Sequence, residues 1–597
     1  AGIASSEPRA ELVAEVSELG DGSAAAAAIS ATDVFDVSAV WEGEPGRSAL
    51  VGLAFVVDAA SSEVAWVPGG VLRDDEVASA LAGHGHVRGH NVKPLMRSLL
   101  EADVDLGGLR LDVAIAAYLI DPAEARYELS DLLLKYTEFA PPSDEASSSG
   151  KLDLDGTAVT PAERAGRDAL AVHHIAGPIE ASLDAQGMAD LYHSIENPLV
   201  RVLAKMEHIG VGVDADTLRS INERLTSEVE TLGAELRLVA GHDDLNLNSP
   251  TQLRALLFDE RELSPVGVKK TKSGYSTDAQ TLEKLKDQWP EFIEPLLRHR
   301  EVEKLRGTYG EGLLHEVAED GRIHATFNQT VARTGRLSSD QPNLHNIPVR
   351  SDEGRVFRTA FVPRPGTSML VADYNQIELR CIAHLAADPG LIDAFTSGQD
   401  IHNATAARVF GVDADDVTLD QRSKAKMVSY GLAYGMEAYG LGQRLNIPTD
   451  EAAVILDAYF EAFPNVKAYM DATVQEARKT GYTETLFGRR RPIPELLNSN
   501  WRIRQAGERQ AMNAGIQGLA ADIFKVALVR IDEALEAGGH DSELVLQVHD
   551  EVIVEVPADE RDTVGEEIVA IMRDAADLDV PLEVNVSWGD TWAAAKG

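Results

Sequence analysis

The sequence of 597 residues contains a single cysteine, Cys381, and no long apolar run. One thiol cannot close a disulfide within the chain, and no CxxC pair or Cys/His cluster has the spacing of a structural zinc site. Residues 1–19 are acidic and lack the basic segment of a secretory signal, so neither secretion nor a membrane span is expected. We therefore expect a cytoplasmic protein; the missing initiator Met fits either a processed chain or an expressed fragment.

Basic side chains are also scarce: 55 Lys and Arg face 97 Asp and Glu, which leaves a net charge of -42. Nucleic-acid binding normally needs a basic surface, so this balance argues against it at first sight. About half of the acid excess lies in residues 1–190, however, and the remainder has local basic islands. Each island taken alone is typical of a solvated face: Lys269, Lys270 and Lys272 beside Tyr275, and Arg489, Arg490 and Arg491 followed by Arg502, Arg504 and Arg509.

The length predicts several domains, and the apolar patterns divide the chain. Residues 48–58 and 62–68 are β-branched apolar runs that suit paired strands, whereas residues 92–102 and 112–120 have helical spacing. Residues 140–150 are rich in Pro, Ser and acids, which indicates a loop or linker. Long amphipathic helices are expected between residues 191 and 306.

Two segments each end an apolar run with an acid. In MLVADYNQIELR (369–380) the run delivers Asp373 at a strand end, and the following residues predict a turn into a helix. In SELVLQVHDEVIVEV (542–556) two β-rich runs predict a tight hairpin that presents Asp550 and Glu551 at its tip. Each acid alone is typical of a helix cap or an ordinary turn. Together, strand-end carboxylates on rigid neighbouring elements are what a pair of divalent ions requires.

A third segment, RSKAKMVSYGLAYG (422–435), repeats functional side chains every four residues. Because each step of four drifts by only about 40°, Arg422, Lys426, Tyr430 and Tyr434 share one helical stripe. Its cationic end suits phosphates and its aromatic end suits a sugar and base. The alternative is a surface helix with inward-packed tyrosines, although Arg and Lys are unusual on a buried face.

These motifs resemble those of the family A DNA polymerases of bacteria, over the extent of the large, Klenow-type fragment. DYNQIELR is similar to motif A, RSKAKMVSYGLAYG to motif B and QVHDE to motif C. Further similar segments are TGRLSSDQPNLHNIPVR (334–350), QDIHNATA (399–406) and RQAMNAGIQGLAADIFK (509–525). Asn375 stands where the family more usually has serine.

The resemblance implies that Asp373, Asp550 and the Tyr374 carbonyl hold two Mg²⁺ ions, which Mn²⁺ can replace, with Glu551 near the primer terminus. Lys426 lies by the α-phosphate and counts with these acids among the catalytic residues. Arg422 and His402 contact the outer phosphates. Tyr430 stacks on the sugar, where tyrosine favours dideoxynucleotide incorporation. Gln376 and Glu378 complete the dNTP site, with Glu378 as the steric gate against a 2′-hydroxyl.

The resemblance also implies a DNA surface. Tyr434 stacks near the templating position. The primer–template minor groove is contacted by Arg336, Arg509, Asn513, Gln517 and His549. Lys269, Lys270 and Lys272 belong to the thumb tip, which grips duplex phosphates. A few suitably placed cations are therefore enough for an acidic chain to bind DNA.

The implied fold class is α/β and multidomain, an RNase H-like 3′-5′ exonuclease domain followed by a right-hand polymerase. The expected domains are an exonuclease-like domain (1–187), mainly thumb (188–327), palm with motif A (328–395), fingers with motif B (396–508) and palm with motif C (509–597). The exonuclease acids are missing: Val37 and Ala39 stand near the first Asp-x-Glu, Leu95 at the second aspartate and Val172 at the last. Asp36 is one residue away, but one acid cannot hold two ions. We expect no proofreading.

The expected function is template-directed DNA synthesis from dNTPs on primer–template DNA, in repair and replication gap filling, by a monomer associated with the nucleoid. A single-subunit RNA polymerase is the second enzyme considered, and Glu378 argues against it because that position is small in those enzymes. A noncatalytic nucleic-acid-binding scaffold is the third possibility. Against it stands the joint presence of Asp373, Asp550, Arg422, Lys426 and Tyr430.

Overall fold

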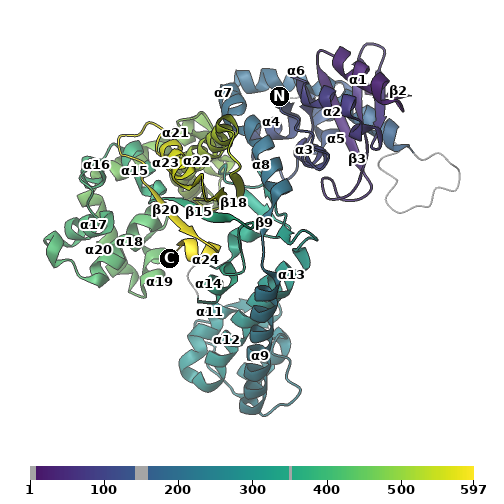
Figure 1. The fold of residues 1–597 in the computed structure, drawn as a ribbon. Coiled ribbons are helices and arrows are strands. Elements are labelled where there is room, and N and C mark those ends of the chain that lie inside the picture. Colours follow the sequence, from purple (N-terminus) through teal and green to yellow (C-terminus); the bar gives the residue numbers. More distant parts are fainter. Residues whose placement is uncertain (1–8, 142–158, 349–351, 434, 597) are drawn as a thin grey trace. The chain divides into compact units, whose positions relative to one another are not determined.

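The computed structural model describes residues 9–141, 159–348, 352–433 and 435–596 (Figure 1). The chain forms two compact units: one comprises residues 1–209, 327–339 and 371–586, and the other residues 210–326, 340–370 and 587–597. No helix in the described ranges is long and apolar enough to cross a bilayer.

The N-terminal part of the first unit is built on a six-stranded mixed sheet. The two predicted strands are present as neighbours, β4 (Leu50–Asp58) and β5 (Glu63–Pro68), and pair antiparallel. Helix α6 (Pro161–Ala185) begins at a Thr160–Glu163 capping box and packs on β3 and β4. The other strands are β2 (Glu15–Glu18), β3 (Phe35–Trp41), β6 (Val87–Gly89) and β7 (Leu109–Asp112), in the order β2-β5-β4-β3-β6-β7.

The helices predicted in this part are confirmed as α3 (Lys93–Leu100) and α4 (Val113–Ile120). The predicted linker at 140–150 begins inside a short strand, β8 (Phe139–Ala140), and from residue 142 onward it lies outside the described residues. Further helices here are α1 (Gly22–Ala31), α2 (Asp75–Ala82), α5 (Leu129–Tyr136) and α8 (Asn197–Ile209).

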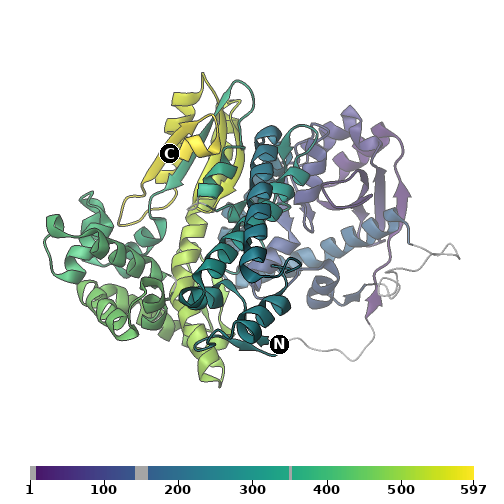
Figure 2. The same ribbon diagram turned by 90° about the horizontal axis from the view of Figure 1, so that it is seen from below.

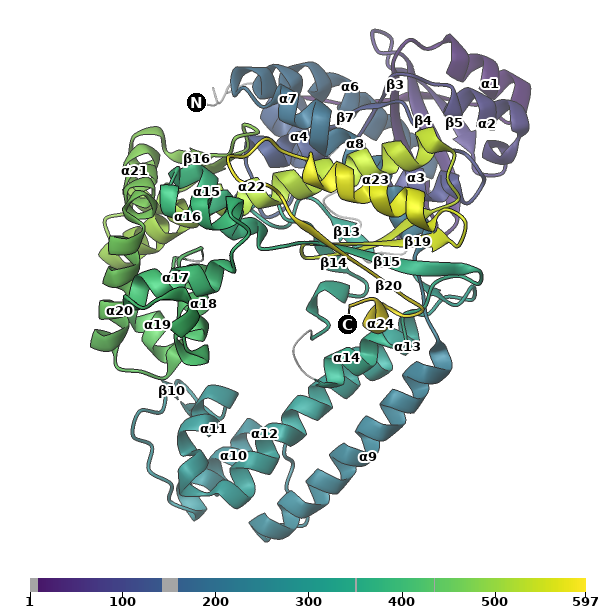
Figure 3. The same cartoon turned by 60° about the vertical axis from the view of Figure 1, so that its left-hand side comes forward.

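A second sheet has four strands in the order β18-β19-β15-β20. Its strands are β18 (Glu543–Val548), β19 (Glu551–Pro557), β15 (Thr367–Tyr374) and β20 (Val584–Gly589). The side chains of β19 from Glu551 to Val556 are all buried. The long helix α22 (Trp501–Gly538) and α23 (Arg561–Arg573) lie over one face of the sheet (Figure 3).

A run of helices between residues 401 and 480 belongs to the same unit. In Figure 2 these green helices stand beside the yellow-green α22, and α18 and α21 pack against it. The run comprises α17 (Ile401–Phe410), α18 (Leu419–Ala433), α19 (Ala438–Leu445), α20 (Thr449–Ala462) and α21 (Pro464–Thr480). Helices α15 (Ile377–Ala386) and α16 (Pro389–Thr396) precede it, and the hairpin β16 (Tyr482–Glu484) and β17 (Arg490–Pro492) follows.

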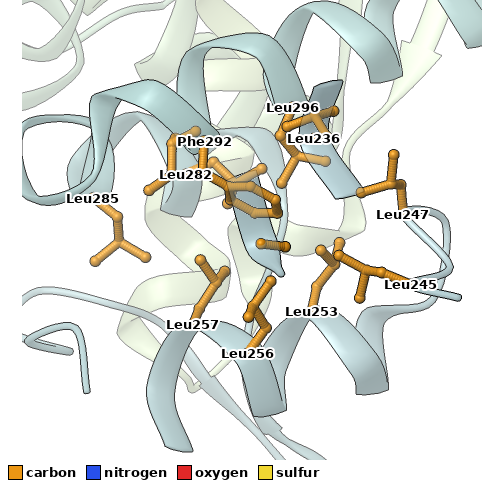
Figure 4. Packing of buried hydrophobic residues seen from close by; sticks show 12 residues of the cluster. Leu236, Leu245, Leu247, Leu253, Leu256, Leu257, Leu282, Leu285, Phe292 and Leu296 are labelled. Carbon is orange, nitrogen blue, oxygen red and sulfur yellow. The ribbon is translucent and has the colours of Figure 1, made fainter. Parts of the chain in front are cut away.

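The second unit is mainly helical, as predicted for residues 191–306. Helix α9 (Ala215–Ala240) is capped by the Asp214 side chain and ends at Gly241, whose φ of 76° favours glycine. Helix α9 packs along α12 (Pro290–Leu305). Figure 4 shows their shared core, where buried leucines from α9, α10 (Pro250–Arg254) and α11 (Ala279–Leu285) surround Phe292. The unit also contains α13 (Gly312–Glu316), α14 (Asp352–Arg358) and α24 (Trp592–Lys596).

Candidate functional site

The predicted hairpin around Asp550 is present. Strands β18 and β19 pair antiparallel, with Val548 opposite Glu551, so the turn consists of His549 and Asp550. His549 takes a left-handed φ of 55°, and the Gln547 amide donates to its carbonyl oxygen at 2.7 Å. The prediction that Glu551 shares the tip is wrong, because Glu551 is the first residue of β19 and is only 5% exposed.

Asp373 lies at the end of β15, as predicted, and the next residue joins the strand to the hairpin. The Tyr374 N–H donates to the Asp550 carbonyl oxygen at 3.3 Å. The Tyr374 hydroxyl donates to the Met572 carbonyl oxygen at 2.7 Å, which anchors this strand end from its other side. Both aspartates are half-buried. Two carboxylates from distant parts of the chain are thereby held on adjoining backbone.

The donor set at this strand end suits a hard divalent cation. Among the described residues no group of three or more His, Cys, Asp or Glu is arranged to hold a metal ion. Mg²⁺ is commonly bound through only one or two carboxylates together with substrate phosphates and water. The pair Asp373 and Asp550, with the Tyr374 carbonyl, therefore fits Mg²⁺ that is completed by a phosphate substrate.

The predicted cationic and aromatic stripe lies on α18, with the exception of Tyr434, which falls outside the described residues. Arg422 donates to the Asp400 carboxylate at 2.7 Å, just before α17. The His402 ring, in the first turn of α17, lies 5.6 Å from the Tyr430 ring. Lys426 is exposed. Helices α17 and α18 therefore bring Arg422 against Asp400 and Tyr430 against the buried His402.

Burial and the nearby Lys426 charge lower the pKa of His402 to about 4, so the ring is neutral at pH 7. His402 is 3% exposed and its Nδ1 has no hydrogen-bond partner among the described residues. Burial alone would raise the pKa of Asp400, but the hydrogen bond and charge of Arg422, together with the backbone N–H groups of Asn403 and His402, lower that pKa. Asp400 was missed as a site residue, although it stands inside the QDIHNATA motif.

The start of α15 carries two of the predicted nucleotide-site residues. Gln376 takes a left-handed φ of 58° and Glu378 is 5% exposed. Arg336 forms an ion pair with Glu378. Asn375 donates its backbone N–H to the Glu583 carbonyl oxygen at 2.8 Å and its amide to the Glu583 carboxylate at 3.3 Å. Glu583, the residue before β20, thus accommodates asparagine at the position where the family more usually has serine.

The predicted minor-groove residues of α22 follow the helix repeat, since Arg509, Asn513 and Gln517 are spaced by four. Arg509 pairs with Glu437 at 3.2 Å. At Gly435, φ is 63° and an added Cβ would lie 2.9 Å from the Asn513 amide nitrogen. The chain that leaves α18 therefore approaches this stripe closely, and only glycine permits that approach.

The three predicted thumb lysines lie in the second unit. Lys270 belongs to the small hairpin of β10 (Lys270–Thr271) and β11 (Gly274–Tyr275), and its Nζ lies 5.4 Å from the Tyr275 ring centroid. Lys269 precedes this hairpin, Lys272 lies in its turn, and both are exposed.

The interpretation of Arg489 as part of a solvated basic island is wrong. Arg489 is 6% exposed and is paired with Glu196, and also with Asp522 at 2.6 Å. Lys525 joins Glu196 at 2.7 Å, which makes a buried cluster of four charges. Local sequence shows the arginine run but not the acids that neutralise Arg489.

The acid nearest to the expected exonuclease positions is already engaged. Asp36 is 1% exposed and accepts from Arg88 at 2.6 Å and from His173 at 2.7 Å. Burial raises its pKa, but His173 and Arg88 together lower it. Apolar side chains at Val37, Leu95 and Val172 are all buried.

Comparisons with known proteins agree with the motifs. The family model described as DNA polymerase family A matches residues 215–594. DNA polymerase I of Mycobacterium tuberculosis (strain ATCC 25618 / H37Rv) is 43% identical over 550 residues, covering 91% of this chain and 60% of that protein. DNA polymerase I of Geobacillus stearothermophilus is 43% identical over 496 residues, covering 83% and 56%. The chain thus spans little more than half the length of these relatives.

A solved structure is similar over almost the whole chain. It is the polymerase domain of Pol1 from M. smegmatis in complex with DNA primer-template and dNTP, with a TM-score of 0.87 and 39% identity. The match covers 98% of this chain and 100% of that one. The resemblance inferred from motifs A, B and C is confirmed, and this chain belongs to DNA polymerase family A.

Proposed function

We propose that this chain is a template-directed DNA polymerase that adds dNTPs to a primer 3′-hydroxyl. The observation that carries the proposal is the hydrogen bond from Tyr374 to Asp550, which holds Asp373 and Asp550 on adjoining backbone. The Mycobacterium smegmatis structure, which contains primer-template and dNTP, supports the same substrates for this chain. The protein acts as a monomer in the cytoplasm, in gap filling during repair and replication.

Two Mg²⁺ ions, or Mn²⁺ in their place, are held by Asp373, Asp550 and the Tyr374 carbonyl. When bound, such ions lower the pKa of the primer hydroxyl and neutralise the leaving pyrophosphate. Glu551 begins the strand beside them and supports the primer terminus. Lys426 binds the α-phosphate from α18, which favours charge that develops there.

The nucleotide is held between α17, α18 and α15. Arg422 and His402 bind the outer phosphates, and Asp400 keeps the Arg422 guanidinium oriented before they arrive. Tyr430 stacks on the sugar, and its hydroxyl favours incorporation of dideoxynucleotides. Gln376 and Glu378 line the sugar side. Glu378 leaves no room for a 2′-hydroxyl, which disfavours the RNA polymerase alternative.

The DNA is bound by two groups of side chains. Arg336, Arg509, Asn513, Gln517 and His549 contact the minor groove, where acceptors common to all base pairs allow recognition of shape without sequence. Tyr434 stacks near the templating base. Duplex phosphates are gripped by Lys269, Lys270 and Lys272. In this proposal residues 188–327 are mainly thumb, residues 328–395 and 509–597 are palm, and residues 396–508 are fingers.

We further propose that residues 1–187 form an exonuclease-like domain without proofreading activity. Asp36 is held by Arg88 and His173, and a carboxylate engaged in this way is a poor ligand for two metal ions. Val37, Leu95 and Val172 contribute only buried apolar surface. The domain's role is structural support.

The experiment uses labelled primer–template DNA with matched and mispaired 3′ ends, Mg²⁺, and dNTPs added or withheld. The wild-type chain extends the matched primer, Asp550→Ala abolishes extension, and neither shortens the mispaired primer without dNTPs. Absence of extension by the wild type would favour the noncatalytic scaffold. Shortening that survives Asp550→Ala would show an active exonuclease site.

A further inference from the structure

An exposed segment at the start of α22 has no role in the proposed polymerase mechanism. Residues 497–503 (LNSNWRI) are all exposed. Three of them are large and apolar: Leu497 is 76% exposed, Trp501 59% and Ile503 40%. Tryptophan is mostly buried in folded proteins, and apolar side chains gathered on a surface mark binding sites.

The cation within this segment is available for a ligand. Arg502 is exposed, and among the described residues no carboxylate forms an ion pair with it. Glu508, two turns further along, is already paired with Arg478 at 2.5 Å. Arg504 donates to the Asn498 carbonyl oxygen at 3.2 Å, and Asn500 caps the helix, so the segment is held in one conformation. The first turn of α22 therefore exposes an aromatic ring and a cation at consecutive positions, about 100° apart around the helix axis.

Arg502 continues the stripe proposed to contact DNA. Seven residues make about 700°, so Arg509 lies about 20° to one side of Arg502 around the helix axis. Asn513 lies about 20° to the other side of Arg502. The rise from Arg502 to Arg509 is about 10 Å, which spans about three nucleotides at 3.4 Å each. One helix face therefore carries Arg502 in line with Arg509 and Asn513.

We propose that Trp501 and Arg502 bind the single-stranded template ahead of the base being copied. This inference rests on the proposed function. The chain that leaves α18 meets the stripe at Arg509 and Asn513, near the proposed templating position, and Arg502 lies two turns beyond. A strand that passes this point is uncopied and unpaired. Aromatic stacking and a backbone-tracking cation are the two elements of sequence-independent single-strand binding.

The test compares labelled primer–template duplexes whose 5′ template overhang is one nucleotide or about ten nucleotides, with a third duplex whose long overhang is paired to a downstream strand. Fluorescence anisotropy gives the affinity of the full chain for each DNA. The wild type binds the long single-stranded overhang more tightly than the short one. In the Trp501→Ala/Arg502→Ala double variant this gain falls by about tenfold, and Arg502→Ala reduces the salt slope by about 0.7.

The matched controls are Arg126→Ala and Val57→Ala, which remove an exposed arginine and an exposed apolar side chain from the N-terminal sheet region. Both keep the overhang-dependent gain. Retention of that gain by the double variant overturns the inference. If the double variant loses equal affinity for the DNA whose overhang is paired to a downstream strand, single-stranded DNA is not the partner of Trp501 and Arg502. Failure of the wild type to incorporate any nucleotide would overturn the proposed function, whereas overhang-dependent binding is measured without dNTPs.

Discussion

The Tyr374 backbone N–H donates a hydrogen bond to the Asp550 carbonyl oxygen at 3.3 Å. This bond joins the end of β15 to the turn between β18 and β19. Because backbone atoms make the link, the spacing of Asp373 and Asp550 does not depend on either carboxylate being charged. A carboxylate can therefore be neutralised without disturbing the strands that carry it.

Asp373→Asn and Asp550→Asn are expected to remove polymerase activity while the chain stays folded. Loss of one ligand charge costs several kcal/mol of transition-state stabilisation, so single-turnover extension falls by at least about 10³-fold. Asp559→Asn changes an exposed acid in the turn that follows β19 and serves as the control. Equal activity of Asp550→Asn and Asp559→Asn would contradict the site, and thermal unfolding checks that each variant is folded.

Glu378 combines two properties that substitutions can separate. Glu378→Ala opens space at the sugar, so the ratio of rNTP to dNTP incorporation is expected to rise by about one to two orders of magnitude. Glu378→Gln retains the volume but removes the charge that pairs with Arg336. This variant keeps most of the sugar discrimination. If Gln relaxes discrimination as much as Ala does, the ion pair with Arg336, not side-chain volume, selects the sugar.

The elements that carry Asp373 and Asp550 are predictable because each is a local pattern: an apolar run that ends at an acid. The contact between them is not predictable locally, since 177 residues separate the two aspartates and strand pairing leaves no mark on either segment alone. The family motifs supplied that relationship. The prediction missed the burial of Glu551 because the turn between β18 and β19 contains only His549 and Asp550, which places Glu551 in the strand.

Charges were the least predictable part. Arg489 belongs to a run of three arginines that suggests a solvated face, yet Glu196, 293 residues earlier, lies buried against it. Asp400 resembles an ordinary helix cap, and only the packing of α17 on α18 reveals that it orients Arg422. Counter-ions contributed by distant segments cannot be read from a local pattern.

His402 is expected to take up a proton when a nucleotide binds. Its pKa is about 4 in the free protein, and the negative charge of a triphosphate raises it. As the pH falls from about 7 to below about 4, this histidine therefore strengthens dNTP binding, by about tenfold in total for each unit by which the nucleotide raises the pKa. Single-turnover incorporation at several dNTP concentrations measures the effect.

His402→Gln is the comparison for that measurement, because it retains hydrogen bonding without titrating in this range. The phosphates of the nucleotide titrate equally in both proteins, so the difference between the two pH profiles belongs to His402. Identical profiles would mean that no proton is taken up there.

The buried cluster around Glu196 is expected to make stability depend on pH. Burial alone would raise the pKa of Glu196, but the charges of Lys525 and Arg489 lower it from 4.5 to about 2. Because the folded-state pKa is the lower one, the stabilisation is complete above pH 4.5 and is lost as the pH falls toward 2. The difference corresponds to about 3 kcal/mol.

Glu196→Gln leaves Lys525 and Arg489 with Asp522 as the remaining acid of the cluster. Removing one partner of a buried charge network costs about 3–5 kcal/mol, so the free energy of unfolding at pH 7 falls by that amount. Glu508→Gln breaks the exposed pair with Arg478 and should cost no more than about 1 kcal/mol. Urea unfolding between pH 3 and pH 7 measures both, and the acid-dependent loss should be smaller in Glu196→Gln than in the wild type. An unchanged slope in Glu196→Gln would assign the pH dependence to other carboxylates.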